Sequence, residues 1–291
     1  MGDIMKRRLL TIGLCLFSTL SLLADGKLYT IGTWNMKWLG GSEGKLDDTE
    51  NLNRYISEIL DSKATLFAIQ EITPSMSERG IVKCQYLDHI IAELNKTQKG
   101  WTYYIDTKNK AQRLGFLYDS TKWTLTQPKC INPGVSFRGN MRKPLMGTFQ
   151  PVDNPTFVLD VMNIHLKAFP DGKEMREKQF EQLANWLKAN QHAENIVICG
   201  DTNIYKGEDP TAPLKGIDFM EAKCDEDTAI YENSLNQKFD RFFLSKAIFE
   251  KSQNASKEVI ADSKQETANG NFKDFEENVS DHFPVTIIVK Y

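Results

Sequence analysis

Apolar residues recur in short runs along most of the chain, and these runs predict a protein rich in β-strands. Nine runs have the length and the β-branched or aromatic content of strands: residues 28–34, 65–70, 101–105, 114–118, 145–149, 157–164, 195–199, 239–244 and 284–289. The runs at 65–70 and 195–199 are apolar throughout, which is typical of central strands covered on both faces.

Three segments between these runs repeat their apolar residues with helical spacing. Their apolar faces are formed by Leu52, Tyr55, Ile56, Ile59 and Leu60, by Leu87, Ile90, Ile91 and Leu94, and by Phe180, Leu183, Ala184 and Leu187. Strand-helix-strand units therefore enclose a series of consecutive strands, an order that neither a purely parallel nor a purely antiparallel sheet accommodates. We predict an α/β fold in which two mixed β-sheets pack face to face with helices outside.

The N-terminal residues follow a different pattern from the rest of the chain. Lys6, Arg7 and Arg8 precede an uncharged run over residues 9–23, and Ala24 is followed by polar residues. This pattern predicts a signal peptide over residues 1–24 and one domain over residues 25–291. As a helix, the uncharged run would rise only ~22 Å, against roughly 30 Å for the hydrocarbon core of a bilayer, so an uncleaved anchor is the second interpretation.

Cleavage of this signal peptide predicts a secreted or periplasmic protein without a membrane anchor, and we expect a monomer. Removal of residues 1–24 takes three basic and one acidic side chain from totals of 36 and 39, leaving 33 Lys and Arg against 38 Asp and Glu. An acidic chain cannot attract nucleic acid through a global positive field. Any phosphate binding must therefore be local, through a few Arg and Lys residues and a metal ion.

Four cysteines remain after cleavage, at Cys84, Cys130, Cys199 and Cys224. In an oxidising compartment they allow up to two disulfides with three connectivities, among which the sequence does not choose. Their spacing matches no zinc pattern. Cys199 ends an apolar run and is expected to be a buried small hydrophobe.

Polar residues that could take part in catalysis or bind a ligand lie at or just beyond the ends of six predicted strands. The segments are Trp34-Asn35, Gln70-Glu71, Asn163-Ile164-His165, Gly200-Asp201-Thr202-Asn203, Phe239-Asp240-Arg241 and Ser280-Asp281-His282. Each segment alone has a structural explanation as a turn, a cap or a surface ion pair. These explanations would have to hold at all six places together, so we predict a functional site built from strand ends.

Three of these residues suit a hard cation. Mg²⁺ is usually held by one or two carboxylates together with water and substrate phosphate. Glu71 and Asp281 suit that role, with Asn35 in support. The sequence therefore predicts a site for Mg²⁺, or for Mn²⁺ or Ca²⁺ in its place.

The remaining polar residues suit the hydrolysis of a phosphodiester. This reaction needs a positioned water, stabilisation of charge on the phosphoryl oxygens and a proton for the leaving oxygen. His165, His282 and the pair Asp201 and Asn203 can supply these needs. Asp240 can orient His282 by accepting a hydrogen bond from its ring.

In this order, the six segments resemble the endonuclease/exonuclease/phosphatase superfamily over nearly the whole mature chain. The resemblance implies a four-layer α/β sandwich with Mg²⁺ or a similar cation at one end. It also implies roles for eight residues: Asn35, Glu71 and Asp281 around the metal, Asp201 and Asn203 positioning water and phosphate, His165 and His282 as the acid/base or charge-stabilising pair, and Asp240 supporting His282.

Within the superfamily, the likeness is greatest to the DNase I-like branch. The segment 239–241 resembles its Tyr-Asp-Arg, the segment 280–285 nearly repeats its Ser-Asp-His-Tyr-Pro-Val, and the segment 141–144 resembles its Arg-Glu-Pro. This match implies that Arg142 contacts a substrate phosphate, which a bidentate guanidinium suits, and gives Arg113 the same role. One departure is Gln112, which stands before Arg113 in place of a Glu and cannot stabilise an imidazolium by charge.

Three functions are consistent with these residues. The leading one is a nuclease that hydrolyses DNA, or RNA, and the local basic patch at residues 134–143, with Arg138, Arg142 and Lys143, favours it. The second is a phosphodiesterase or phosphatase of the same fold that acts on a lipid headgroup, as sphingomyelinases do. It calls for an exposed aromatic or apolar loop. No long stretch of that kind stands out, although Phe137, Phe169 or Phe242-Phe243 could contribute. The third, a non-catalytic binding scaffold, is disfavoured because all the core polar residues are present.

Overall fold

The computed structural model describes residues 26–41, 49–78, 81–110, 112–190, 194–231, 234–252, 261–263 and 271–291. The signal peptide predicted at residues 1–24 lies outside the described residues. Within the described part, none of the helices combines the length and the apolar character that a membrane crossing needs.

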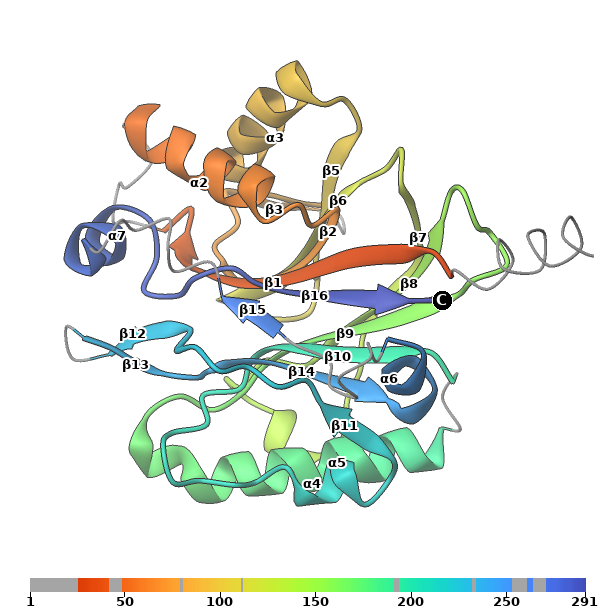
Figure 1. The fold of residues 1–291 in the computed structure, drawn as a ribbon. Coiled ribbons are helices and arrows are strands. Elements are labelled where there is room, and N and C mark those ends of the chain that lie inside the picture. Colours follow the sequence, from red (N-terminus) through yellow and green to blue (C-terminus); the bar gives the residue numbers. More distant parts are fainter. Residues whose placement is uncertain are drawn as a thin grey trace, which may run out of the picture.

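Two mixed six-stranded sheets pack against each other (Figure 1). The first sheet consists, in spatial order, of β15 (Ala261–Ser263), β16 (Val285–Lys290), β1 (Leu28–Leu39), β2 (Leu66–Ile72), β6 (Arg113–Asp119) and β5 (Trp101–Ile105). The second consists of β11 (Phe219–Glu221), β14 (Asp240–Ser245), β10 (Ile196–Asp201), β9 (Leu159–His165), β8 (Leu145–Pro151) and β7 (Trp123–Cys130). Two short hairpins are added by β3 (Met76–Glu78) with β4 (Ile81–Lys83) and by β12 (Ala229–Tyr231) with β13 (Ser234–Gln237).

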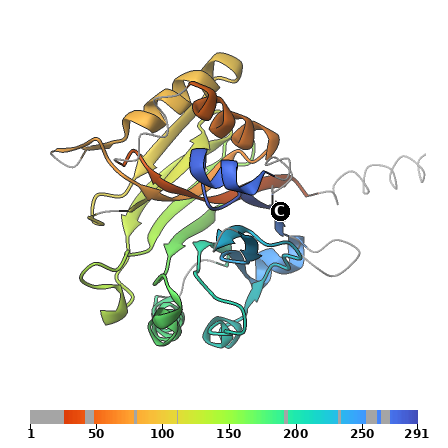
Figure 2. The same ribbon diagram turned by 90° about the vertical axis from the view of Figure 1, so that its left-hand side faces the viewer.

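Helices cover the outer faces of both sheets (Figures 1 and 2). The helices α2 (Thr49–Asp61) and α3 (Gln85–Thr97) lie on the first sheet, and α4 (Lys173–Ala189) and the short α5 (Ala212–Lys215) lie on the second. The helix α6 (Lys246–Ser252) packs against β14 and β16, and α7 (Phe272–Asn278) precedes β16. Single 3-10 turns occur at η1 (Val135–Phe137) and η2 (Pro170–Gly172).

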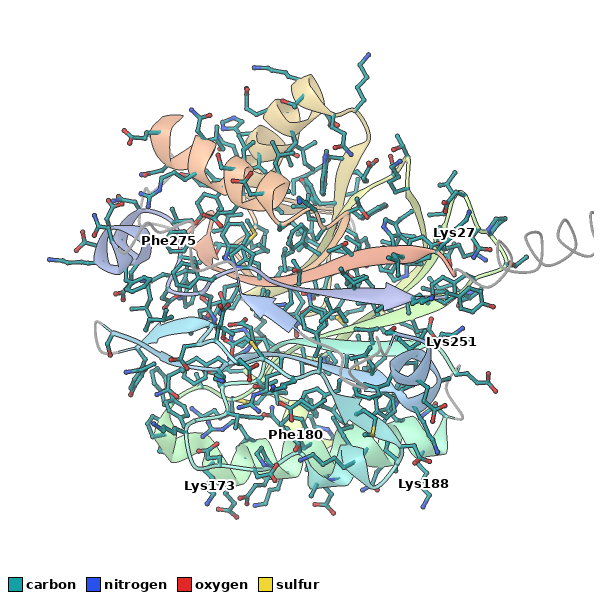
Figure 3. The ribbon with its side chains drawn as sticks, in the orientation of Figure 1. Lys27, Lys173, Phe180, Lys188, Lys251 and Phe275 are labelled. Atoms are coloured by element: carbon teal, nitrogen blue, oxygen red, sulfur yellow. The ribbon has the colours of Figure 1, made fainter. Side chains whose placement is uncertain are left out.

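Three apolar clusters fill the spaces between these layers. One lies between the sheets and includes Phe116 and Phe149, whose rings meet edge to face. The second joins the first sheet to α2 and α3, and the third joins the second sheet to α4. Side chains of the labelled residue Phe180 and its neighbours fill this third layer (Figure 3). The predicted four-layer α/β sandwich is therefore confirmed.

The strand directions bring all six predicted polar segments to one end of the sandwich. The pairs β1–β2 and β9–β10 are parallel, and in each pair the connection contains a helix, α2 or α4. The strands β14 and β16 run antiparallel to β10 and β1, so they begin where β10 and β1 end. As a result, Asp201 lies in register with both His165 and Asp240.

All nine predicted strands are present, although β1 continues to Leu39, beyond its predicted end at residue 34. The sequence pattern missed β7 at the edge of the second sheet. This strand alternates polar residues, contains Pro128 and is interrupted by an irregularity between Thr126 and Lys129. Proline is tolerated in strands at such edges and bulges, where no ladder hydrogen bond is lost.

The four cysteines of the domain are free thiols, so the structure contains neither of the two disulfides that the sequence allows. Cys199 is fully buried in the cluster between the sheets, which confirms its interpretation as a small hydrophobe. Burial also raises the pKa of its thiol, which keeps the group protonated and unreactive.

Gly200 is the position in the central strand β10 that a side chain cannot occupy. Its φ is +141°, and a Cβ atom there would lie 2.0 Å from the carbonyl oxygen of Ile164. We expect Gly200→Ala to destabilise the fold by about 3 kcal/mol, from backbone strain and overpacking, which lowers Tm by roughly 5–10 °C. Thermal unfolding followed by circular dichroism measures this change.

Gly216→Ala is the matched control. Gly216 has helical backbone angles, and the nearest atoms would lie 3.5 Å from an added Cβ. This substitution should leave Tm unchanged or raise it slightly, by the equivalent of ~0.5 kcal/mol. Equal Tm values for the two variants would contradict the close approach of β9 and β10 described here.

Candidate active site

A cleft of about 1050 Å³ opens at the end of the sandwich where the six polar segments meet. Five of these segments contribute residues to its lining, and next to the sixth, Trp34-Asn35, the lining includes Lys37 and Trp38. The end of the molecule that holds the cleft is turned toward the viewer in Figure 2. The sequence therefore predicted the location of the site, and the arrangement of individual side chains inside it is the new information.

Irregularities in the first sheet direct Glu71 into the cleft. The register of β2 against β6 shifts between Ile69 and Ile72, and Glu71 has a left-handed backbone with φ 59°. The register of β1 against β2 shifts in the same region, between Asn35 and Leu39. Such bulges commonly turn a side chain that would otherwise follow the regular alternation of a strand.

A buried hydrogen-bonded bridge joins the two sheets directly behind the cleft. Nε2 of Gln70 donates to Oδ1 of Asn163 at 2.8 Å, and Nδ2 of Asn163 donates to the carbonyl oxygens of Ile69 and Gly115 at 2.9 and 2.8 Å. Both side chains are fully buried. Because Glu71 follows Gln70 and His165 lies two residues after Asn163, this bridge fixes the distance between the two functional strand ends.

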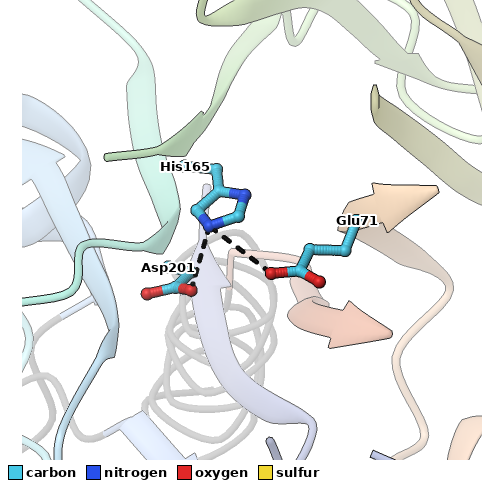
Figure 4. Close-up of side chains that lie close together, drawn as sticks. All are labelled: Glu71, His165 and Asp201. Carbon is cyan, nitrogen blue, oxygen red and sulfur yellow. Dashed lines mark ion pairs between the residues drawn. The ribbon is translucent and has the colours of Figure 1, made fainter. Parts of the chain in front are cut away.

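Glu71, His165 and Asp201 converge at the floor of the cleft (Figure 4). Nε2 of His165 lies 3.7 Å from Oε1 of Glu71 and 3.4 Å from Oδ2 of Asp201. Nδ2 of Asn35 donates to the same two carboxylates, at 3.2 and 3.0 Å. The three residues form a group of potential ligand atoms that all lie within 4.8 Å of one another.

This group fits a divalent cation. Burial and the negative charges of Asp281 and Asp201 raise the pKa of Glu71, and burial likewise raises the pKa of Asp201. Carboxylates that repel each other in a buried place are stabilised by a cation, and oxygen-rich donors suit Mg²⁺ or Mn²⁺. Asn35 presents the NH₂ group of its side chain to the two carboxylates. To offer its oxygen to a cation, this side-chain amide would have to rotate.

Asp281 is not one of the three residues whose ligand atoms converge, although the sequence placed it with Glu71 at the metal. Its Oδ2 is 4.0 Å from Nζ of Lys37, which also lies 3.6 Å from Oε1 of Glu276 and donates to the carbonyl oxygen of Glu276. Asp281 still lines the cleft. The structure therefore adds His165 and Asp201 to the candidate ligands and pairs Asp281 with a lysine that sequence reasoning did not single out.

Asp240 orients His282, in the geometry that the sequence predicts. Nδ1 of His282 lies 2.7 Å from Oδ2 of Asp240, and Nε2 of His282 faces the cleft, 3.7 Å from Oδ2 of Asp201. Thr228, which sequence reasoning missed, donates to the same oxygen of Asp240 at 2.9 Å and accepts from its amide. Burial alone would lower the pKa of His282, but the charges of Asp240 and Asp201 outweigh it and raise this pKa well above its ordinary value.

His165 has the opposite protonation preference. Burial, reinforced by the positive charges of Arg142 and His282, holds the pKa of His165 well below its ordinary value. Its Nδ1 is buried and has no hydrogen-bond partner among the described residues. Gln112 lines the same cleft but does not bond this nitrogen, so the chain lacks the support that the resemblance assigns to a Glu at that position.

The two predicted phosphate ligands have different surroundings. Arg142 lines the cleft, where its Nη2 donates to the carbonyl oxygen of Leu166 at 2.5 Å. Asn203 also lines the cleft, and its backbone amide donates to Oδ1 of Asp201. Arg113 does not line the cleft: it is 8% exposed, and its Nη1 donates to the carbonyl oxygen of Asp106 at 2.7 Å. The guanidinium of Arg113 faces the backbone of Asp106 and not the cleft, so this geometry gives no support to the phosphate contact predicted for Arg113.

Strained backbone is concentrated around the cleft. Nine residues other than glycine in the described part have positive φ, and six of them line the cleft. They are Lys37, Trp38, Glu71, Gln112, Phe169 and Asn203. Such conformations cost about 1–3 kcal/mol each and persist where the surrounding structure imposes them, often at functional sites. No sequence signal identifies them, because none of these residues is a glycine.

Solved structures similar to this chain share its fold. An endonuclease/exonuclease/phosphatase family protein from Bacteroides thetaiotaomicron has a TM-score of 0.63 and 15% identity, and the match covers 92% of this chain and 99% of that one. D. rerio TDP2 in complex with a single-strand DNA product has a TM-score of 0.61 and 15% identity, covering 91% and 100%. A mannosyl-6-phosphatase from B. thetaiotaomicron VPI-5482 has a TM-score of 0.60 and 15% identity, covering 90% and 100%.

No protein-family model and no curated protein matches the chain. The structural likenesses therefore establish the fold, which is that of endonuclease/exonuclease/phosphatase proteins, as the sequence resemblance implies.

Binding of Mn²⁺ tests the candidate metal group. We expect Glu71→Gln to lower the affinity for Mn²⁺ at least about tenfold, because it removes a charged ligand from a site of few ligands. Asp281→Asn should have a smaller effect, since Asp281 lies beside Lys37. Isothermal titration calorimetry measures both affinities, with Glu174→Gln on the exposed face of α4 as the control. Equal affinities of wild type and Glu71→Gln would exclude this group as the metal site.

Proposed function

We propose that the chain is a divalent-metal-dependent hydrolase of phosphodiester bonds, with nucleic acid as its substrate. One observation carries this proposal: a carboxylate group fit for a cation, an imidazole oriented by a carboxylate and a partly buried arginine all face a single cleft. These groups are Glu71 and Asp201, His282 with Asp240, and Arg142. The shared fold supports the same chemistry, because the similar structures include a phosphatase and a DNA-bound protein.

Each of these residues has a role that follows from its position. Glu71, Asp201 and His165, with Asn35, would hold the cation, which supplies positive charge to stabilise the phosphoryl oxygens in the transition state. Arg142 adds a guanidinium on the same side of the cleft, where it can pair with a non-bridging oxygen.

In this proposal His282 transfers a proton, and Asp201 and Asn203 position the attacking water. Nδ1 of His282 is occupied by Asp240, so Nε2 is the nitrogen that can exchange a proton with the substrate or with water. Asp201 lies between the two imidazoles, and Asn203 is held against it, so this pair can position the attacking water. Asp281 and Lys37 form the neighbouring wall.

The charge of the cleft supports nucleic acid as substrate. Cationic side chains that line the cleft besides Arg142 are Lys37, Lys108, Lys110, Arg138, Lys143 and Lys167. This collection provides the local attraction for phosphates that an acidic chain needs. The DNase I-like relationship remains part of the proposal and rests on the segments at 141–144, 239–241 and 280–285.

A second candidate is a phosphodiesterase that acts on a lipid headgroup. The observation that favours it is the exposure of Trp38 and Phe169 on the cleft, since exposed aromatic rings can enter a membrane surface. The basic lining is common to both candidates, because both substrates carry phosphate. The substrates themselves must therefore separate the two.

Substitution of the two histidines tests the proposed chemistry. We expect His165→Ala and His282→Ala each to lower kcat by at least about 10²-fold, since each removes a group that binds the cation or transfers a proton. The assay is hydrolysis of plasmid DNA, RNA, bis(4-nitrophenyl) phosphate and sphingomyelin with Mg²⁺, Mn²⁺ or Ca²⁺. His89→Ala is the matched control, because His89 is exposed on α3, far in sequence from the site segments.

Three results would contradict the proposal. They are full activity in EDTA, unchanged cleavage by either histidine variant, and hydrolysis of sphingomyelin without cleavage of nucleic acid. The last result would establish the second candidate in place of the first.

We also propose that the protein is exported and acts outside the cytoplasm, which the charge and apolar pattern of residues 1–24 supports. Expression of the full chain in a bacterial host should yield a mature protein that begins at or near Asp25. N-terminal sequencing of the exported fraction measures this. The double substitution Leu14→Asp and Leu16→Asp is expected to keep the uncleaved chain in the cytoplasm.

A further inference from the structure

Two aromatic side chains on the cleft are exposed in a way that the proposed chemistry does not explain. Trp38 is 43% exposed and Phe169 is 63% exposed. Among the exposed large hydrophobic residues of the described part, they are the two aromatic ones, and both line the cleft. Exposed rings next to a polar site are available for a ligand to contact.

The position of Phe169 is enforced by a buried cation. Its φ is +70°, and its carbonyl oxygen accepts from Nη1 of Arg176 at 2.8 Å. The same Nη1 donates to the carbonyl oxygen of Lys167 at 2.7 Å, while Nε and Nη2 of Arg176 bind both carboxylate oxygens of Glu208. Arg176 is fully buried. A buried guanidinium with four hydrogen bonds therefore holds an exposed ring in a strained conformation at the cleft.

Trp38 belongs to the other sheet, where the neighbouring strand β2 holds its backbone. It lies in the irregular part of β1, with φ 53°, and its amide donates to Oε2 of Glu71 at 3.2 Å. The carboxylate proposed to bind the cation thus also sets the backbone that carries this ring. Trp38 lies near the end of β1 and Phe169 lies shortly after the end of β9, and each has a lysine one or two residues before it, Lys37 or Lys167.

The chemistry of this rim favours bases as its ligand. Flat aromatic faces beside lysines and arginines are what proteins use to bind single-stranded nucleic acid, in which the bases are free to stack on side chains. In an intact duplex the base faces are already stacked, and only their edges are accessible in the grooves. Nζ of Lys167 lies 5.2 Å from the centre of the Phe169 ring, so a positive charge that can attract a phosphate accompanies this ring.

We infer that Trp38 and Phe169 stack against unpaired bases next to the scissile phosphate, and that the preferred substrate is therefore single-stranded nucleic acid. This inference rests on the proposed function, because it identifies the form of nucleic acid that the same cleft accepts. Arg176 and Glu208 act as positioning residues for Phe169.

The test compares a short labelled oligonucleotide as a single strand and as a duplex, with Mg²⁺ or Mn²⁺, for wild type, Trp38→Ala and Phe169→Ala. We expect wild type to prefer the single strand. Each variant should lower kcat/KM for the single strand about tenfold, the size expected for one lost stack of a base on an aromatic ring, and should lower it less for the duplex. A defect in folding would affect both substrates equally, so the ratio of the two values isolates stacking.

Substitutions and a modified substrate separate stacking from apolar contact. Phe169→Trp should retain the single-strand preference and Phe169→Leu should lose it, although leucine keeps the apolar bulk. With an oligonucleotide that has abasic sites on both sides of the cleaved bond, wild type should fall to the level of the alanine variants. Met220→Ala is the matched control, because Met220 is 42% exposed on β11 and does not line the cleft.

Failure of the inference and failure of the proposed function give different results. Cleavage of nucleic acid with a preference for the duplex overturns the inference alone, and so does an equal loss for both forms in alanine variants whose Tm equals that of wild type. Sedimentation of wild type with sphingomyelin vesicles that is lost in Trp38→Ala or Phe169→Ala would assign these rings to a membrane surface and likewise overturn it. No cleavage of any nucleic acid by wild type would overturn the proposed function itself.

Discussion

The site depends on a hydrogen-bonded bridge between two side chains inside the sandwich, Gln70 and Asn163. Two sheets that pack only through apolar side chains can slide with little change in energy, because apolar contacts have no direction. A buried amide pair joined by directional hydrogen bonds favours one register, since a shift would break the bonds of Asn163 to Gln70, Ile69 and Gly115 and leave these polar groups unsatisfied. The distance from Glu71 to His165 is set by this bridge, and with it the geometry of the carboxylate group.

The fold could be predicted from the sequence because the pattern of apolar residues indicates which segments are buried. The apolar runs identified the central strands, and the parallel connection through α2 and α4 follows from the alternation of strands and helices. The sequence also predicted the location of the site, because the polar residues stand where those runs end. The edge strand β7 was missed because its sequence is largely polar and only Trp123 in it is buried, whereas the aromatic edge strand β5 was predicted.

The arrangement inside the site was less predictable, and two residues show why. Asp281 and Arg113 each stand in a motif, but the direction of their side chains depends on local bends and on contacts with distant residues. Asp281 turns toward Lys37, and Arg113 turns inward to Asp106. Neither direction is encoded in the alternation of apolar and polar residues. Thr228 escaped notice for a similar reason, because a lone threonine in a polar loop carries no signal until Asp240 is placed beside it.

The pairing of the first strand with the last has a consequence for the synthesis of the chain. Nε1 of Trp34 in β1 bonds the carbonyl oxygen of His282, a residue 248 positions later, and β16 then pairs with β1 along its length. At ordinary rates of translation, β1 leaves the ribosome roughly 10–50 s before this partner exists. During that interval one edge of β1 is unpaired, and His282 has not been made. A nascent chain therefore lacks a complete candidate active site until its last residues are synthesised, in whichever compartment the mature protein acts.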